Sequence, residues 1–298
     1  MRNELHKQVE GQLCPEGNWK LSDTMNRILK RCVNCLPQGC PSEEETRYPT
    51  LPIGMRAFLD TFFARHFFQI QDSLIEYMTS DGFLGKLREG QLNILDIGCG
   101  PAVGSLAVTD LVMCIMKNLR TWNHGGMKSK VKVTYVLNDT SDICLGTGRV
   151  LLRNYLNLNR VRLENRVIGN LISIGAPFPS NLRQLKRIRD NVGNYDLIIM
   201  SYVVIPLDEN FEGEQLLDAF GNILHLCDSS GRVLIVQDQF RETLVRKVSK
   251  MIGERFEKRT LRQHVYSSEN GNSCQTYKYF SCLCAPGGQT VSQKRVVA

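Results

Sequence analysis

The stretch that decides the fold is Ile94-Leu95-Asp96-Ile97-Gly98-Cys99-Gly100-Pro101-Ala102-Val103-Gly104. An apolar run that ends in an acid predicts a buried strand, and the glycines after it predict a tight turn into a helix. Ligands of open α/β sheets bind at the carboxyl ends of strands, where glycine lets the backbone approach a ligand closely. A dinucleotide-binding turn has its third glycine at position 103, which is Val103 here, so the pattern disfavours a nicotinamide-dependent dehydrogenase.

Short β-rich runs and helical stretches alternate from residue 91 onward. This alternation predicts an α/β protein with a mostly parallel sheet, because parallel strands need a crossover connection. The continuous apolar runs at 195–200 and 232–236 predict strands buried on both faces. A helix is expected over 240–256, with Arg241 to Arg262 forming its basic face, and a terminal antiparallel strand over 275–285. The expected strands are 92–98, 131–139, 165–172, 195–204, 232–238 and 275–285.

The patterning divides the chain into four parts. Residues 1–54 are rich in proline and cysteine and are expected to form an irregular arm. Apolar residues at three- and four-residue steps from Met55 to Met78 predict one long amphipathic helix, within a helical segment over 55–90 that precedes the main domain. His66 lies beside the apolar stripe and is expected to be a packing residue. The main domain is expected over 91–286, followed by a flexible tail over 287–298.

Composition limits the possible classes of function. The chain has 298 residues, 42% hydrophobic, with a net charge of +7, which is ordinary globular composition and permits an anionic partner such as RNA without requiring one. It shows no secretory signal and no apolar stretch of about 18 residues, so we expect an intracellular, cytoplasmic protein with no membrane partner. Eleven cysteines, an odd number, suit reduced thiols better than a disulfide framework.

Four N-terminal cysteines raise the question of a metal. Cys32 and Cys35 form one Cys-x-x-Cys pair, with Cys40 following and Cys14 upstream. Four thiolates are what a structural zinc site requires, but such sites usually carry two pairs at this spacing. We therefore expect unliganded thiols and no metal, with a zinc site as the alternative.

At the glycine turn the sequence resembles the class I, Rossmann-like S-adenosylmethionine-dependent methyltransferases. Their first motif runs hydrophobic-hydrophobic-acid-x-Gly-x-Gly-x-Gly, and the chain has LDIGCGPAVG with Ala102 at the third position. Asn138-Asp139-Thr140-Ser141 resembles the family's segment after the second strand, although Asp139 also suits a helix N-cap. Segments resembling the third, fourth and fifth strands follow at 167–170, 195–201 and 229–236.

The resemblance implies a doubly wound fold and S-adenosylmethionine as cofactor. It implies that Asp139 accepts hydrogen bonds from the ribose and that Asn170 lies near the adenine. The residues it places at the cofactor are Asp96, Gly98, Cys99, Gly100, Asp139, Thr140, Asn170 and Ser201. The loop after the fourth strand usually faces the transferred methyl group. Within it, Tyr202 is a candidate for orienting an acceptor or packing on the adenine, and Asp208 and Glu209 are candidate bases or solvated carboxylates.

The acceptor stays open at this stage. Clusters of basic residues favour RNA, for example ribosomal RNA, although most such charges are solvated helix faces. The helical segment before the first motif favours a small-molecule N- or O-methyltransferase, and a catalytically silent binding protein is a third alternative. The basic clusters are Arg183, Lys186, Arg187 and Arg189; Arg27, Lys30 and Arg31; Arg153, Arg160, Arg162 and Arg166; and Arg241 to Arg262.

Overall fold

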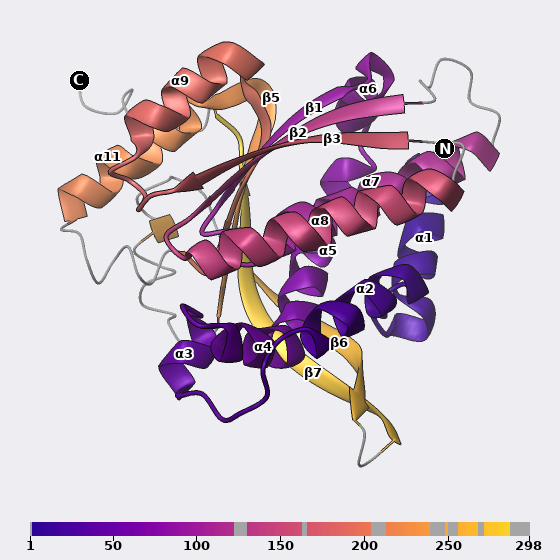
Figure 1. The fold of residues 1–298 in the computed structure, drawn as a ribbon. Helices are drawn as coiled ribbons and strands as arrows, with labels where there is room; N and C mark the ends of the chain where they lie inside the picture. Colours follow the sequence, from indigo (N-terminus) through magenta and orange to yellow (C-terminus); the bar gives the residue numbers. More distant parts are fainter. Residues whose placement is uncertain are drawn as a thin grey trace, which may run out of the picture.

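A seven-stranded sheet forms the centre of the protein (Figure 1), with the strand order β3-β2-β1-β4-β5-β7-β6. The computed structural model describes residues 2–121, 130–162, 166–203, 213–238, 248–249, 256–267 and 271–286. Strands β1 to β5 are parallel, and β7 is antiparallel to both β5 and β6. The strands are β1 (Gln91–Ile97), β2 (Lys130–Asp139), β3 (Arg166–Gly175), β4 (Tyr195–Ser201), β5 (Cys227–Asp238), β6 (Glu257–Ser267) and β7 (Gly271–Cys284).

Helices cover both faces of the sheet (Figure 1). On one face α5, α7 and α8 pack in one hydrophobic cluster, and on the other α9 and α11 pack in a second cluster. The helices are α1 (Arg2–Leu13), α2 (Asp23–Asn34), α3 (Glu43–Arg47), α4 (Pro52–Thr61), α5 (Phe63–Met78), α6 (Asp81–Glu89), α7 (Val103–Thr121), α8 (Asp142–Arg162), α9 (Leu182–Val192) and α11 (Gly213–Leu224), with a short 3₁₀ turn at Pro15–Gly17. The expected α/β class, with its antiparallel terminal strand, is confirmed.

The central strands are buried on both faces, as their apolar runs predict. In β4 every residue from Tyr195 to Met200 is buried, and successive residues of β1 alternate between the two clusters, Ile94 in one and Leu95 in the other. Strand β6 was missed, because the expected basic helical face ran through to Arg262, which lies within β6. Most of the expected helix over 240–256 lies outside the described residues.

The expectation of an irregular N-terminal arm is wrong. Helix α1 packs against α7, and α2 packs against α8. In α1 the buried residues Leu5, Val9 and Leu13 recur every four positions, which is the spacing of one helix face. The helix start at α2 is fixed by Ser22, whose hydroxyl accepts a hydrogen bond from the Met25 amide at 3.2 Å. The prolines that suggested irregular structure lie at helix starts and in the links between helices.

The expected single helix from Met55 to Met78 is two helices, α4 and α5. They meet at Phe62, whose φ of −110° departs from helical geometry. The bend allows Phe58 on α4 and His66 on α5 to reach the same end of the sheet.

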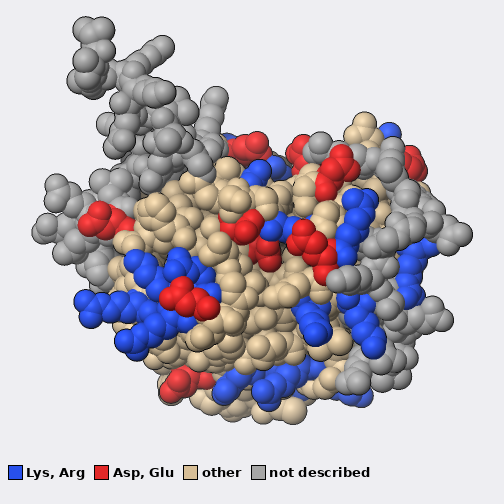
Figure 2. Space-filling model, turned by 90° about the horizontal axis from the view of Figure 1, so that it is seen from above, with Lys and Arg blue, Asp and Glu red and all other residues tan. Residues whose placement is uncertain are grey.

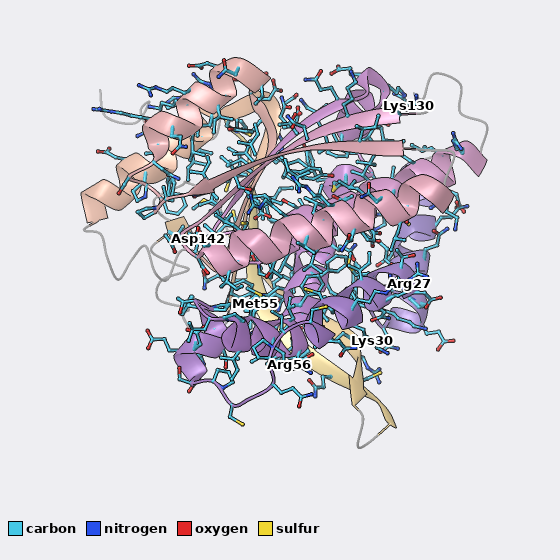
Figure 3. All side chains as sticks on the ribbon, viewed as in Figure 1. Arg27, Lys30, Met55, Arg56, Lys130 and Asp142 are labelled. Carbon is cyan, nitrogen blue, oxygen red and sulfur yellow. The ribbon has the colours of Figure 1, made fainter. Side chains whose placement is uncertain are left out.

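Arg56 fixes the end of α2 to α4. Its Nη1 donates to the carbonyls of Val33 at 2.8 Å and Leu36 at 2.9 Å, which lie in the last turn of α2 and just after it. Figure 3 shows Arg56 near one end of α2 and labels Arg27 and Lys30, two basic residues of that helix. Among the described residues, none of the helices combines the length and apolar character that crossing a bilayer requires.

Candidate functional site

The glycine turn after β1 adopts backbone conformations that side chains disfavour. Gly98 and Gly100 have φ values of +61° and +52°, and Ala102 has +59°, in the left-handed region. A Cβ atom on Gly98 would lie 2.3 Å from Cγ2 of Val203, so a larger residue requires the turn or the end of β4 to move. The Cys99 amide donates to the Asn138 carbonyl at 3.0 Å, which joins the turn to the end of β2.

Asp96 lies directly under this turn and is 1% exposed. Its Oδ2 accepts hydrogen bonds from the Ser105 amide at 2.8 Å and the Ser105 hydroxyl at 2.9 Å. Its Oδ1 has no hydrogen-bond partner among the described residues. Burial raises the pKa of Asp96 to about 7, and the nearby Asp139 carboxylate adds to the rise. The site therefore holds a buried acceptor whose charge a cation would stabilise.

Asp139 ends β2 beside the turn. Its Oδ2 accepts from the Gly100 amide at 2.8 Å and its Oδ1 from the Ser141 amide at 2.9 Å, while burial raises its pKa. The helix-cap alternative applies to Ser141 instead, because the Ser141 hydroxyl accepts from the Cys144 amide in the first turn of α8 at 3.3 Å. Asp139 is thus bound to the glycine turn and lies where the resemblance places a ribose-binding acid.

A cavity of about 170 Å³ lies at the carboxyl ends of β1, β2 and β4. It brings together most of the residues expected at a cofactor, which come from the glycine turn and from the ends of these three strands. The expected residues that line the cavity are Asp96, Gly98, Cys99, Gly100, Asp139, Thr140, Ser201 and Tyr202.

The structure does not bring Asn170 to this cavity. Strand β3 continues to Gly175, which pairs with Asp139, whereas Asn170 pairs with Thr134 in the middle of β2. Asn170 lines a separate surface pocket at the edge of the sheet, together with Lys130 and Arg153. The expectation for Asn170 is wrong because the third strand is longer than its sequence pattern indicated.

The N-terminal helices contribute a wall that the sequence did not reveal. The α3–α4 loop, residues 48–51, contributes to the cavity lining, and the Ser141 hydroxyl donates to the Pro49 carbonyl at 2.6 Å. Phe58 approaches the glycine turn, since its Cζ lies 3.9 Å from where a Cβ on Gly100 would be. The wall residues from this region are Arg47, Tyr48, Pro49, Thr50, Phe58 and His66.

His66 forms the wall of the cavity together with Tyr202. Their rings stack with centroids 3.8 Å apart, and the Tyr202 hydroxyl donates to Oε1 of the buried Gln69. Tyr202 has a φ of +62°, a strained conformation typical of functional sites. Burial lowers the pKa of His66 well below its usual range, and Arg65 lowers it further. His66 is a packed histidine, as expected, and it also presents a neutral ring to the cavity.

The N-terminal cysteines are not brought together as a zinc site. All four are described, and no group of three or more His, Cys, Asp or Glu side chains able to hold a metal occurs within the described ranges. Cys35 and Cys40 are exposed, whereas burial raises the thiol pKa of Cys14 and of Cys32 to about 11. The candidate bases Asp208 and Glu209 lie outside the described residues.

The strand order, the glycine turn and the acid at the end of β2 are now established together. The chain has a Rossmann-like, doubly wound α/β fold. No protein-family model matches the sequence, and no curated protein matches it either. Several solved structures are similar to the chain, and three of them, each at 15% sequence identity or below, are described next.

The first of these is a precorrin-6y C5,15-methyltransferase from Geobacter metallireducens GS-15, with 15% identity, a TM-score of 0.36, and coverage of 66% of this chain and 83% of that one. The second is the magnesium protoporphyrin IX methyltransferase of Synechocystis PCC 6803 with bound S-adenosylmethionine, with 14% identity, a TM-score of 0.37, and coverage of 94% and 97%. The third is an rRNA methylase from Streptococcus thermophilus, with 14% identity, a TM-score of 0.31, and coverage of 67% and 93%. At this level of identity the likeness concerns the fold alone.

The α3–α4 loop supplies a prediction that is independent of any ligand. The Glu45 carboxylate accepts hydrogen bonds from the amides of Thr50 at 2.7 Å and Leu51 at 2.5 Å. Replacing Glu45 with alanine leaves both amides without this acceptor, so their hydrogen–deuterium exchange is expected to accelerate about tenfold or more. Glu45→Gln keeps one acceptor oxygen and should show a smaller change. Unchanged exchange in the alanine variant would mean that Glu45 does not hold the loop.

Proposed function

We propose that the protein is an S-adenosylmethionine-dependent methyltransferase. The observation that carries this proposal is the placement of Asp96 and Asp139 on either side of a glycine turn, at the adjoining ends of β1 and β2, in one cavity. Hydroxyl groups and positive charge suit two neighbouring carboxylates, whereas pyrophosphate is repelled by them. S-adenosylmethionine carries a ribose, an ammonium and a sulfonium group, and so matches this pair.

The residues present fit this cofactor. Asp139 accepts hydrogen bonds from the amides of Gly100 and Ser141 through different oxygens, and because a carboxylate has about four acceptor sites it can also accept one from a ribose hydroxyl. Asp96 Oδ1, which has no partner in the described part of the chain, is an acceptor for a positively charged group. The cavity has a volume of about 170 Å³, which is below the roughly 300–1,000 Å³ typical of ligand pockets.

When bound, the cofactor supplies an electrophilic methyl group. The chain's own residues orient the acceptor, because methyl transfer needs in-line approach more than dedicated acid–base machinery. Tyr202 and His66 line the side of the cavity where we place the methyl-accepting substrate. The neutral ring of His66 can accept a hydrogen bond from that substrate. The stack between the two rings limits their motion.

We favour RNA as the methyl acceptor because the chain has a net charge of +7 and because the surface of α9 is basic. A small-molecule acceptor is the second candidate, and the aromatic wall formed by Phe58, His66 and Tyr202 beside a small covered cavity supports it. The two differ in salt dependence, because binding to RNA weakens steeply as ionic strength rises.

The first test is a calorimetric titration of the purified protein with S-adenosylmethionine and S-adenosylhomocysteine, with NAD as the control. We expect micromolar binding of the first two and no binding of NAD. Absence of binding to both methyl-donor compounds would contradict the proposed function and favour a catalytically silent fold.

A further inference from the structure

Helix α9 is amphipathic and carries a cluster of basic residues. Leu185 is fully buried against the second hydrophobic cluster, and Leu182, Ile188 and Val192 pack around it. The helix also carries Arg183, Lys186, Arg187 and Arg189, of which Arg183 and Arg187 are exposed, with Asp190 as its one acid. Figure 2 shows basic side chains gathered at the left of the view, the side on which α9 lies in Figure 1.

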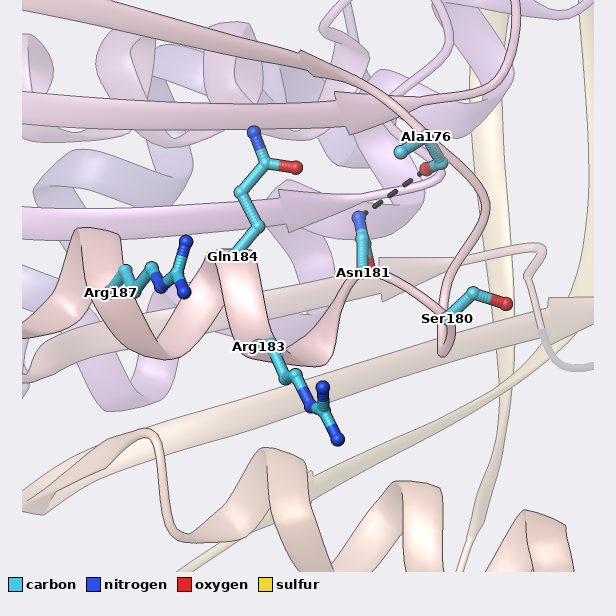
Figure 4. A pocket seen from close by; sticks show the side chains of 6 residues that line it. All are labelled: Ala176, Ser180, Asn181, Arg183, Gln184 and Arg187. Carbon is cyan, nitrogen blue, oxygen red and sulfur yellow. Dashed lines mark hydrogen bonds between the residues drawn. The ribbon is translucent and has the colours of Figure 1, made fainter.

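Two of these arginines line an open groove. The groove has a volume of about 490 Å³ and is lined by Ala176, Ser180, Asn181, Arg183, Gln184 and Arg187. Figure 4 shows the Arg183 and Arg187 side chains leaving α9 from successive turns of the helix. Four helical residues rise about 6 Å, so the groove presents two guanidinium groups in a row along the helix.

Arg183 and Arg187 differ from their basic neighbours, each of which has a polar partner within the protein. Lys186 donates to Oδ1 of Asn222 at 2.8 Å, and Arg189 pairs with Asp190 at 2.6 Å. Within the part of the chain that the structure describes, Arg183 and Arg187 make no hydrogen bond or salt bridge. Their guanidinium groups are therefore available to an external anion.

The groove begins at the same edge of the sheet as the cofactor cavity. The carbonyl of Ala176 accepts hydrogen bonds from Asn138 Nδ2 at 2.8 Å and from Asn181 Nδ2 at 3.3 Å. Asn138 directly precedes Asp139 in the cavity wall, and Asn181 is the N-cap residue of α9. One carbonyl thus joins the start of the groove to the strand that supplies the ribose-binding acid.

We propose that the groove along α9 binds the phosphodiester backbone of an RNA acceptor through Arg183 and Arg187. This inference rests on the proposed function, since it names the substrate class of that site. Arginine is the side chain best suited to phosphate, because its planar fork donates two parallel hydrogen bonds to the phosphate oxygens. Such contacts position a strand without reading its sequence, which is what delivery of one nucleotide to a neighbouring cavity requires.

The test compares Arg183→Glu/Arg187→Glu with the control Arg88→Glu/Lys132→Glu. The control changes the net charge by the same amount. Its two residues are exposed near the amino ends of the parallel strands, where α6 ends and β2 begins. The probe is a fluorescein-labelled 20-nucleotide single-stranded RNA of mixed sequence, and its anisotropy is measured from 50 to 300 mM KCl. We expect the groove variant to bind at least tenfold more weakly at low salt, with a salt slope smaller by about 1.4, as two lost phosphate contacts on a single strand imply.

The control should bind this RNA within twofold of the wild type. Equal weakening in both variants, or none in the groove variant, would overturn the inference. Anionic phospholipid vesicles form a second arm, and loss of vesicle binding with RNA binding intact would also overturn it.

Titration with S-adenosylmethionine separates the two proposals. Arg183 and Arg187 do not line the cofactor cavity, so the groove variant should keep wild-type affinity for the cofactor. If the wild type binds RNA through this groove and binds no cofactor, the proposed function fails while the RNA surface stands. If it binds the cofactor and the groove variant binds RNA normally, the groove inference alone fails.

Discussion

Gly98→Ala is expected to weaken S-adenosylmethionine binding by at least a hundredfold. Two costs add at this position. The φ of +61° is strained for any residue with a side chain, by about 1–2 kcal/mol, and the new methyl group would meet Val203 Cγ2 at 2.3 Å. Relief requires the turn to separate from the end of β4, which moves the cavity wall on both sides. Calorimetric titration measures the loss, and thermal unfolding shows whether the variant is folded.

Two other glycines provide matched controls. Gly100→Ala has a similar φ of +52° but its nearest neighbour is 3.9 Å away, so it tests the backbone strain without the collision and should cost about tenfold in affinity. Gly85→Ala lies in α6 with nothing within 4 Å and should stabilise the protein by about 0.5–1 kcal/mol with unchanged binding. If Gly98→Ala binds the cofactor within threefold of the wild type, the turn does not contact it.

The sequence predicted the central sheet well, for a physical reason. Parallel strands buried on both faces are continuous apolar runs, as in β4 and β5, and the helices between them have a clear period, so local pattern and tertiary position agree. The glycine turn was recognisable because positive φ values at Gly98 and Gly100 require glycine at fixed offsets from the acid. These features place Asp96 and Asp139 without any long-range information.

Contacts between distant segments were not predictable in this way. Leu5, Val9 and Leu13 have helical spacing, but the polar residues between them weaken the signal, and α1 is stabilised by packing on α7. His66 has the pattern of a core residue, and nothing local shows that its neighbour is Tyr202, far along the chain. Asn170 was misplaced because strand ends depend on pairing, which continues to Gly175.

Asp96→Asn is expected to shift stability and ligand binding in opposite directions. The asparagine Oδ1 can accept both hydrogen bonds from Ser105 that Asp96 Oδ2 accepts now. Its amide nitrogen would take the place of an oxygen that has no partner among the described residues, so the substitution removes a buried charge, whose cost exceeds that of the new buried N–H donors. Above pH 7 we therefore expect the variant to unfold at a higher temperature and to bind S-adenosylmethionine at least tenfold more weakly, since its positive groups lose their carboxylate partner.

The pH dependence distinguishes this explanation from a simple packing change. Burial raises the pKa of Asp96 from 3.8 in the unfolded chain to about 7 in the folded protein, so the folded state holds a proton that the unfolded state releases between these values. The free energy of unfolding of the wild type therefore falls as pH rises from 4 to 7, by roughly 4 kcal/mol at most. Because the asparagine side chain of the variant does not titrate, its stability advantage should grow over this range and level off above pH 7, as urea unfolding at pH 5 and pH 8 would show. Cofactor affinity should follow the opposite course, rising through pH 7 in the wild type as the Asp96 carboxylate ionises and staying flat in the variant. If the variant and the wild type differ in stability by the same amount at pH 5 and at pH 8, Asp96 is ionised throughout and its charge is stabilised within the protein.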